Sequence, residues 1–176
     1  YEYCFINEKY PKIDYDVNLV RVANIDIEVG SESGFPDPAD VAEPITAITI
    51  YYKNIYWVLG IGDYKQHRED VKYISCNNEN DLILKFLDMW QKMDVDIITG
   101  WNTQFFDIPY LYRRITKKFD EKMAKKLSPC GQIEERIVKI MNRKNYAYVL
   151  CGISSIDYIK RYKKFTYTQQ ESYRLD

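Results

Sequence analysis

The stretch Val20–Val29 (Val-Arg-Val-Ala-Asn-Ile-Asp-Ile-Glu-Val) limits most strongly how this chain can fold. Its β-branched, apolar residues predict a central β-strand. Because side chains alternate along a strand, Asp26 and Glu28 share one face, about 6.5–7 Å apart along the strand. Two like charges on a core strand are costly unless a cation lies between them, and a divalent metal suits oxygen ligands. Exposure on an edge strand, or pairing with Lys or Arg, would satisfy the same carboxylates without a metal.

Composition narrows the class of protein. The chain has 176 residues, enough for one domain with a sizeable core, and a net charge of −1. Any nucleic-acid site must therefore be local, or must use metal ions and aromatic stacking. His67 is the only histidine, which argues against chemistry that needs a histidine base. No apolar run approaches the roughly 20 residues of a membrane span, so no membrane partner is expected.

Cysteine spacing and the first residue give expectations about origin. The cysteines are scattered without a C-x-x-C pair, which predicts reduced thiols in a cytosolic protein. They are Cys4, Cys76, Cys130 and Cys151. The chain begins at Tyr1 rather than Met, so we expect a fragment or a processed product. Residues 1–19 are expected to lead in from an upstream domain, and residues 20–176 to form one domain.

The order of predicted elements is that of a mixed α/β fold. Residues 44–52 and 56–60 predict an antiparallel hairpin, which makes a three-stranded meander with the first strand. A helix is predicted from a cap at Asn77 or Asn78 to about Met93, because its apolar residues recur at helical spacing. Residues 96–100 predict a short buried strand, after which a second helix follows.

Two further residues stand out beside these elements. Asp107 directly precedes a helical pattern with Pro109 in its first turn, so it is a helix cap in one interpretation and a ligand in the other. Its position after a buried strand and loop is where α/β folds place functional groups. Phe35 lies in the Gly- and Pro-rich loop 30–38, where a large apolar side chain either packs against the core or serves a function.

The last third of the chain predicts a hairpin followed by a short strand and helix. Alternating apolar residues from Ile133 to Leu150 flank a basic tip, Met141–Asn145. Residues 152–162 predict a strand that turns into a short helix. The basic run within residues 113–126 is more typical of a solvated helix face than of phosphate contacts.

The carboxylate strand and the later series Trp101-Asn-x-x-x-Phe-Asp107 together resemble the first and second exonuclease motifs of family B DNA polymerases. The surrounding sequence is most similar to the T-even bacteriophage replicative polymerases. D-x-E alone is a weak signal and N-x-x-x-F-D a moderate one, but the ordered series of matches from about Val20 to Asp176 is strong. Matching segments are Arg21–Val29, Gly34–Pro38, Pro44–Thr49, Gly100–Asn102, Phe106–Tyr110, Leu127–Pro129, Gly152–Ser154 and Tyr162–Phe165.

This resemblance implies an RNase H-like α/β fold and 3′→5′ proofreading of DNA with two divalent ions, Mg²⁺ or Mn²⁺. It implies that Asp26, Glu28 and Asp107 are the catalytic metal ligands. It further implies that DNA is contacted by Phe35, Asn102 and Phe106, and by Met141, Arg143 and Lys144 of the hairpin. Implied partners are the single-stranded 3′ end of a primer, the remaining polymerase domains and a sliding clamp, in the cytoplasm of an infected bacterium.

One feature of the family pattern is missing. The fourth carboxylate of the family lies in a Tyr-x-x-x-Asp motif, which does not occur in the matching context here. We therefore expect a chain truncated before the third exonuclease motif and nearly inactive alone. The alternative function is a non-catalytic module that binds single-stranded nucleic acid or docks to polymerase parts. An independent RNase H-like ribonuclease is disfavoured by the polymerase-like flanks.

Overall fold

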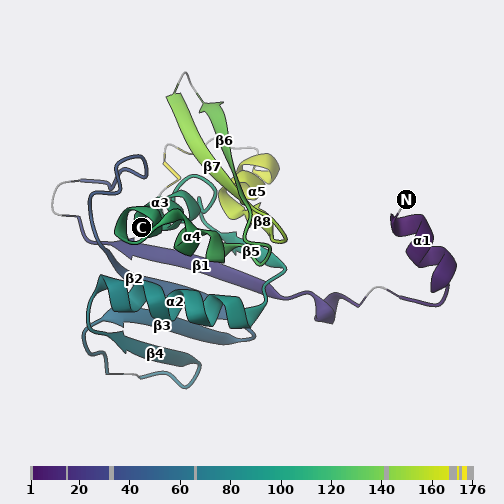
Figure 1. Cartoon of the computed structure of the whole chain (residues 1–176), viewed down its shortest axis with the longest axis horizontal. Helices are drawn as coiled ribbons and strands as arrows, with labels where there is room; N and C mark the ends of the chain where they lie inside the picture. The colour runs from purple at the N-terminus through teal and green to yellow at the C-terminus, as the bar shows by residue number, and fades with distance from the viewer. Residues whose placement is uncertain are drawn as a thin grey trace.

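The central sheet has six strands in the order β4-β3-β2-β1-β5-β8 (Figure 1). Their bounds are β1 Val22–Val29, β2 Ile45–Tyr52, β3 Ile55–Ile61, β4 Val71–Cys76, β5 Ile97–Gly100 and β8 Ser154–Asp157. The first three strands form the antiparallel meander that the sequence predicts. β5 and β8 extend the sheet parallel to β1, and β4 runs parallel to β3. The computed structural model describes residues 2–14, 16–31, 34–65, 67–140, 143–166, 170 and 172–173.

β1 has one buried and one open face. Ala23, Ile25 and Ile27 are buried, while Asp26 and Glu28 point the other way and are exposed. The shared face of the two carboxylates is as predicted. The sequence left two environments open for these carboxylates, a buried face of a core strand and an exposed edge strand. The structure combines features of both, because the strand is central and yet its carboxylates reach solvent. Within the described residues, neither carboxylate forms an ion pair.

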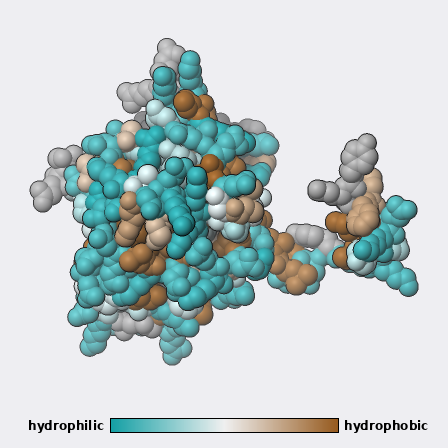
Figure 2. Space-filling view, viewed as in Figure 1, coloured by the Kyte–Doolittle hydropathy of each residue, from teal (hydrophilic) through white to brown (hydrophobic). Residues whose placement is uncertain are grey.

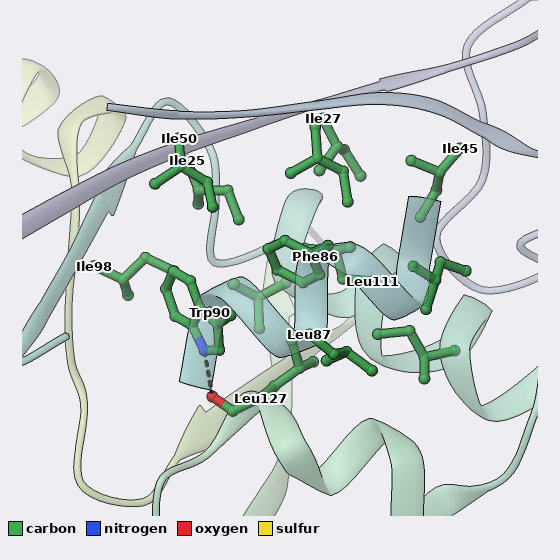
Figure 3. Packing of buried hydrophobic residues seen from close by; sticks show 14 of the residues in the cluster. Ile25, Ile27, Ile45, Ile50, Phe86, Leu87, Trp90, Ile98, Leu111 and Leu127 are labelled. Carbon is green, nitrogen blue, oxygen red and sulfur yellow. Dashed lines mark hydrogen bonds between the residues drawn. The ribbon is translucent and has the colours of Figure 1, made fainter. Parts of the chain in front are cut away.

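Two helices cover the buried face of the sheet. α2 (Glu79–Met93) begins after Asn78, whose side chain accepts a hydrogen bond from the Asp81 amide at 3.1 Å, as the sequence predicts. α3 (Asp107–Lys118) starts one residue earlier than predicted, because Asp107 is its first residue. Isoleucines of the sheet point toward Phe86 and Trp90 of α2 and Leu111 of α3 (Figure 3). This packing fixes β1 and the start of α3 relative to each other.

A buried ion pair ties α2 to α3. Glu79 accepts hydrogen bonds from Nε and Nη2 of Arg114, both at 2.7 Å, and from the Ile45 amide at 2.8 Å. Arg114 also donates to the carbonyls of Val41 and Ala42. Burial alone would raise the pKa of Glu79, but these hydrogen bonds hold it below its ordinary value. The pair belongs to the scaffold, since every oxygen of the acid has a donor.

The remaining elements surround this core. A short helix α4 (Glu121–Ala124) and a 3₁₀ turn (Lys125–Leu127) follow α3, and the Leu127 carbonyl accepts from Trp90 Nε1 at 2.9 Å (Figure 3). β6 (Ile133–Ile140) and β7 (Arg143–Leu150) form the predicted hairpin, which projects from the body (Figure 1). α5 (Tyr158–Phe165) follows β8, as the strand-to-helix pattern predicts.

Four details differ from the sequence-based expectation. β1 begins at Val22, because residues Val17–Leu19 form a 3₁₀ turn that ends at Val20. β4 was not predicted, since its six residues follow a polar loop and gain their strand partner only in the fold. Arg143–Asn145 belong to β7 rather than to a loop, so the predicted tip is shorter. A helix, α1 (Glu2–Lys9), stands where an irregular segment was expected.

α1 lies apart from the body, and the segment that joins them carries exposed apolar residues (Figures 1 and 2). Ile13, Val17 and Leu19 are among them. The apolar residues of α1 show almost no helical periodicity, which explains why this helix was not predicted. No helix in the described part of the chain is long and apolar enough to cross a membrane.

Candidate functional site

Asp107 joins the start of α3 to the edge of β1. β5 pairs with β1 only as far as Asn24, so the amide of Ile27 lies beyond the paired residues. Asp107 Oδ1 accepts the hydrogen bond from this amide at 3.1 Å. The helix N-cap is Phe106, without a side-chain cap, so the carboxylate is not used to cap the helix. The capping interpretation of Asp107 is therefore wrong.

The charges of Asp26 and Asp107 interact. Asp107 is 2% exposed, and burial together with the negative charge of Asp26 raises its pKa to about 7, against the opposite effect of the Ile27 amide. Asp26 is open to solvent on one side, yet the protein around it removes enough water to raise its pKa too. Two carboxylates that repel each other, with no cation beside them in the described residues, form a site where a bound cation would be stabilising.

Glu28 completes the predicted ligand set only in part. It follows Asp26 on the same face of β1, at a point where the register with β2 shifts. Among the described residues, no three His, Cys, Asp or Glu side chains gather closely enough to hold a metal ion. The structure thus brings Asp26 and Asp107 together but does not assemble a three-carboxylate cage with Glu28.

Gly100, just before the loop 101–106, lies very close to the backbone of β1 and to the side chain of Thr103. A Cβ at Gly100 would lie 2.6 Å from the carbonyl oxygen of Ile25 and 2.4 Å from Thr103 Cγ2, so only glycine fits there. Asn102 follows with a positive φ of 62°, and its carbonyl accepts hydrogen bonds from the amides of Phe105 and Phe106. The loop is a compact turn that delivers Phe106 and Asp107 beside β1.

Asp157 fixes this loop from the far edge of the sheet, and sequence analysis did not single it out. Its carboxylate, in a residue only 5% exposed, accepts hydrogen bonds from the amides of Asn102 at 3.0 Å and Gln104 at 3.1 Å. It also accepts from the Ile159 amide at 3.1 Å, which caps α5. An Asp directly before a helical pattern is the signal that could have identified it. We regard Asp157 as a positioning residue for the loop.

An open cavity of about 660 Å³ lies at the loop that precedes Asp107. Phe35, Asn102 and Phe106, three residues predicted to bind substrate, are among its lining residues. The rings of Phe35 and Phe106 lie 4.8 Å apart, and Phe35 is 71% exposed, so it is not a core residue that anchors its loop. Because Asp107 directly follows Phe106, the cavity and the carboxylates are neighbours along the chain.

The hairpin residues predicted to contact DNA are placed less fully. Lys144 is exposed on β7, and Asn145 beside it lines the same cavity. Met141 lies outside the described residues, as does the side chain of Arg143. The base of the hairpin packs on α3 through Tyr148, whose ring stacks on Tyr112 at 4.4 Å.

Comparison with known proteins gives the family. The model of the DNA polymerase family B exonuclease domain matches residues 5–176. The DNA-directed DNA polymerase of Escherichia phage RB69 is 36% identical over the whole of this chain, which covers 23% of that relative. The corresponding polymerase of Enterobacteria phage T4 is 29% identical, with the same coverage. A herpesvirus relative, the DNA polymerase catalytic subunit of Equine herpesvirus 2, is 29% identical over 57% of this chain and 10% of its own length.

The phage matches cover the whole chain but only part of each relative, and they agree with the observed sheet. The chain spans about a quarter, 23%, of the phage polymerases that it matches. The six-stranded mixed sheet with flanking helices is consistent with an RNase H-like exonuclease domain, as expected from the resemblance. The chain belongs to the exonuclease domain family of the family B DNA polymerases.

Proposed function

We infer that this chain acts as a 3′→5′ proofreading exonuclease that removes nucleotides from single-stranded primer ends of DNA. The observation that carries this function is the pair Asp26 and Asp107: burial, together with the negative charge of Asp26, raises the pKa of Asp107 to about 7, and Phe106, the residue before Asp107, lines an open aromatic cavity. A module that only binds nucleic acid gains nothing from two uncompensated carboxylates next to its binding surface. The family match supports the same function.

Exonuclease domains of this family generally use divalent metals, and the oxygen donors of the carboxylate pair suit them, although the described residues do not gather a third carboxylate beside the pair. Carboxylate oxygens are the ligands that Mg²⁺ and Mn²⁺ prefer, and Asp26, Glu28 and Asp107 would hold two such ions with help from water and substrate oxygens. When bound, divalent ions supply an activated water and stabilise the charge that develops on the phosphate. The Ile27 amide orients Asp107, and the loop fixed by Asp157 sets the distance of Asp107 from β1.

The aromatic cavity would receive the unpaired end of the primer. Phe35 and Phe106 offer faces on which bases can stack, at about 1–3 kcal/mol per base and without sequence preference. Asn102 would border the terminal nucleotide. Met141, Arg143 and Lys144 of the hairpin would help to separate primer from template. Such contacts suit a nuclease that removes any mismatched nucleotide.

In the whole polymerase, we propose that residues 20–176 work with the remaining polymerase domains and with a sliding clamp, in the cytoplasm of an infected bacterium. Residues 1–19 would connect the domain to an upstream one. The long relatives support this context, because about three quarters of their length lies outside the matched region.

A manganese titration tests the proposed function. Paramagnetic broadening of NMR signals should appear at residues around Asp26 and Asp107 in the wild-type chain and disappear in Asp26→Ala. Asp88→Ala, which removes an exposed carboxylate on α2, is the matched control and should leave the broadening unchanged. Degradation of a labelled single strand with Mg²⁺ or Mn²⁺, if seen, should be lost in the same variant. Manganese binding that survives Asp26→Ala would favour the non-catalytic binding module.

A further inference from the structure

The cavity at the loop before Asp107 has further lining residues, which no motif of the sequence indicated. Besides Phe35, Phe105 and Phe106, the lining includes residues of α5, among them Lys160 and Lys163. The two lysines are three residues apart on a helix, so they share one face. Their side chains are exposed at the cavity. The lining of the cavity therefore combines aromatic rings with cationic side chains.

These lysines differ from others on the described surface. Lys85 and Lys92 of α2, and Lys125 just after α4, each pair with a carboxylate four residues earlier in the chain. Within the described residues, neither Lys160 nor Lys163 has a carboxylate within ion-pair distance. Two ammonium groups that line one cavity without a carboxylate partner would both be stabilised by an anion bound there.

The contacts that the two lysines do make orient them. Lys160 donates to the side-chain oxygen of Gln104 and lies 5.2 Å from the centre of the Phe105 ring. Lys163 lies 4.2 Å from the centre of the Tyr173 ring. Neutral oxygens and ring faces leave the positive charges uncompensated. The side chains are therefore positioned along the cavity while their charge is left for a ligand.

One acidic residue lies among the lining residues, and its role is local. Asp37 accepts a hydrogen bond from the Ala39 amide at 2.8 Å, which stabilises the turn after Pro36. The described lining thus carries two cations and one anion, in a chain whose net charge is −1. Positive charge here is a local feature, of the kind expected if a near-neutral protein binds a polyanion.

We propose that Lys160 and Lys163 bind phosphodiester groups of the single strand whose bases stack on Phe35 and Phe106. A cationic groove along the backbone with aromatic faces for the bases is the combination that binds single strands without sequence preference. This inference rests on the proposed function, and it adds a binding surface on α5 for the strand that leads to the carboxylates. The phosphodiester chain, rather than a free mononucleotide, is the ligand, because the lysines lie beside stacking positions for more than one base.

Salt dependence of binding tests this assignment. Fluorescence anisotropy of a short labelled oligo(dT), with Ca²⁺ in place of Mg²⁺, gives the affinity between about 50 and 200 mM salt. The double variant K160Q/K163Q should bind about tenfold or more weakly at low salt, and its slope of log K against log salt should fall by about 1.4. The single variant K163Q keeps the contact between Lys160 and Gln104 and should lower the slope by about 0.7.

A matched control uses the same helix. R161Q/K164Q removes the same charge from α5 at positions that do not line the cavity, and its slope should stay at the wild-type value. Phe35→Ala should weaken binding without changing the slope, because stacking releases no counterions. Thymidine 5′-monophosphate should compete poorly, whereas strong competition would point to a mononucleotide site instead.

The outcomes separate this inference from the proposed function. Equal slopes for wild type and K160Q/K163Q, with binding still weakened in Phe35→Ala, would overturn the lysine assignment and leave the exonuclease proposal standing. If the slope fell equally in R161Q/K164Q, the whole of α5 would act as a diffuse positive charge, and the assignment to Lys160 and Lys163 would also be overturned. Absence of oligo(dT) binding by the wild-type chain at low salt would reject the nucleic-acid site itself.

Discussion

Glu79 and Asp107 are two buried carboxylates with opposite environments. Glu79 is 7% exposed and accepts a hydrogen bond from the backbone amide of Ile45 in β2. Asp107 is 2% exposed and accepts one from the backbone amide of Ile27 in β1. Glu79 also has Arg114, which holds its pKa below the ordinary value, whereas burial and the charge of Asp26 raise the pKa of Asp107 to about 7. A buried acid with a full set of donors stabilises the scaffold, and one left beside another acid marks a place for a cation.

The largest expected effect comes from breaking the satisfied pair. Arg114→Met should lower the free energy of unfolding by about 3–5 kcal/mol, because Glu79 is left buried without its main partner. Urea unfolding measures this change. Lys92→Met, which removes the cation of the exposed pair with Asp88, is the control and should cost less than about 1 kcal/mol. Similar costs for the two variants would show that Glu79 is better hydrated than its burial indicates.

The sequence predicted the elements that carry the two acids, but not the long-range contacts that make their environments different. The alternation in Val22–Val29 places Asp26 and Glu28 on one face, and helical spacing predicts α2 and the start of α3, because these patterns are local. The meander was predicted for the same reason. The ion pair of Glu79 was not, since it joins residues 35 apart in sequence. The bonds of Asp157 to the loop span more than 50 residues and were equally invisible.

The candidate site was predictable to a similar degree. Family motifs pointed to Asp26, Asp107, Phe35 and Phe106, which the fold brings into one neighbourhood, while their roles in binding and catalysis stay predictions. Lys160 and Lys163 were not singled out from the sequence, and only the fold places them at the cavity. Exposure and shared cavities depend on tertiary packing, which no local pattern encodes.

The unsatisfied acid gives the second prediction. Asp107→Asn should raise the free energy of unfolding of the metal-free chain by about 1–3 kcal/mol at about pH 8, since it removes a buried charge next to Asp26 and keeps an acceptor for Ile27. Asp40→Asn, at an exposed position, should change little. Unfolding in EDTA provides the measurement, and added Mn²⁺ should then stabilise the wild type more than Asp107→Asn. If the Asp107→Asn chain were less stable than wild type in EDTA, the charge of Asp107 would be satisfied in the fold, and the contrast with Glu79 would be wrong.

The smallest and sharpest effect is the pH dependence, in which the two acids should act in opposite directions. The folded-state pKa of Glu79 is lowered, so its stabilisation is present above its unfolded pKa of about 4.3 and is lost as pH falls through the folded value. The free energy difference between wild type and Glu79→Gln should therefore shrink on acidification.

The folded-state pKa of Asp107 is raised to about 7, so its protonated form favours folding at low pH and this contribution disappears as pH rises. The advantage of Asp107→Asn over wild type should accordingly grow between about pH 4 and pH 7. Urea unfolding of the three chains across this range, with EDTA present, measures both differences. When both differences are taken as wild type minus variant, the difference for Glu79→Gln should rise with pH and the difference for Asp107→Asn should fall. If both changed in the same direction with pH, the two acids would share one kind of environment, and the assignment of one to the scaffold and the other to a cation site would fail.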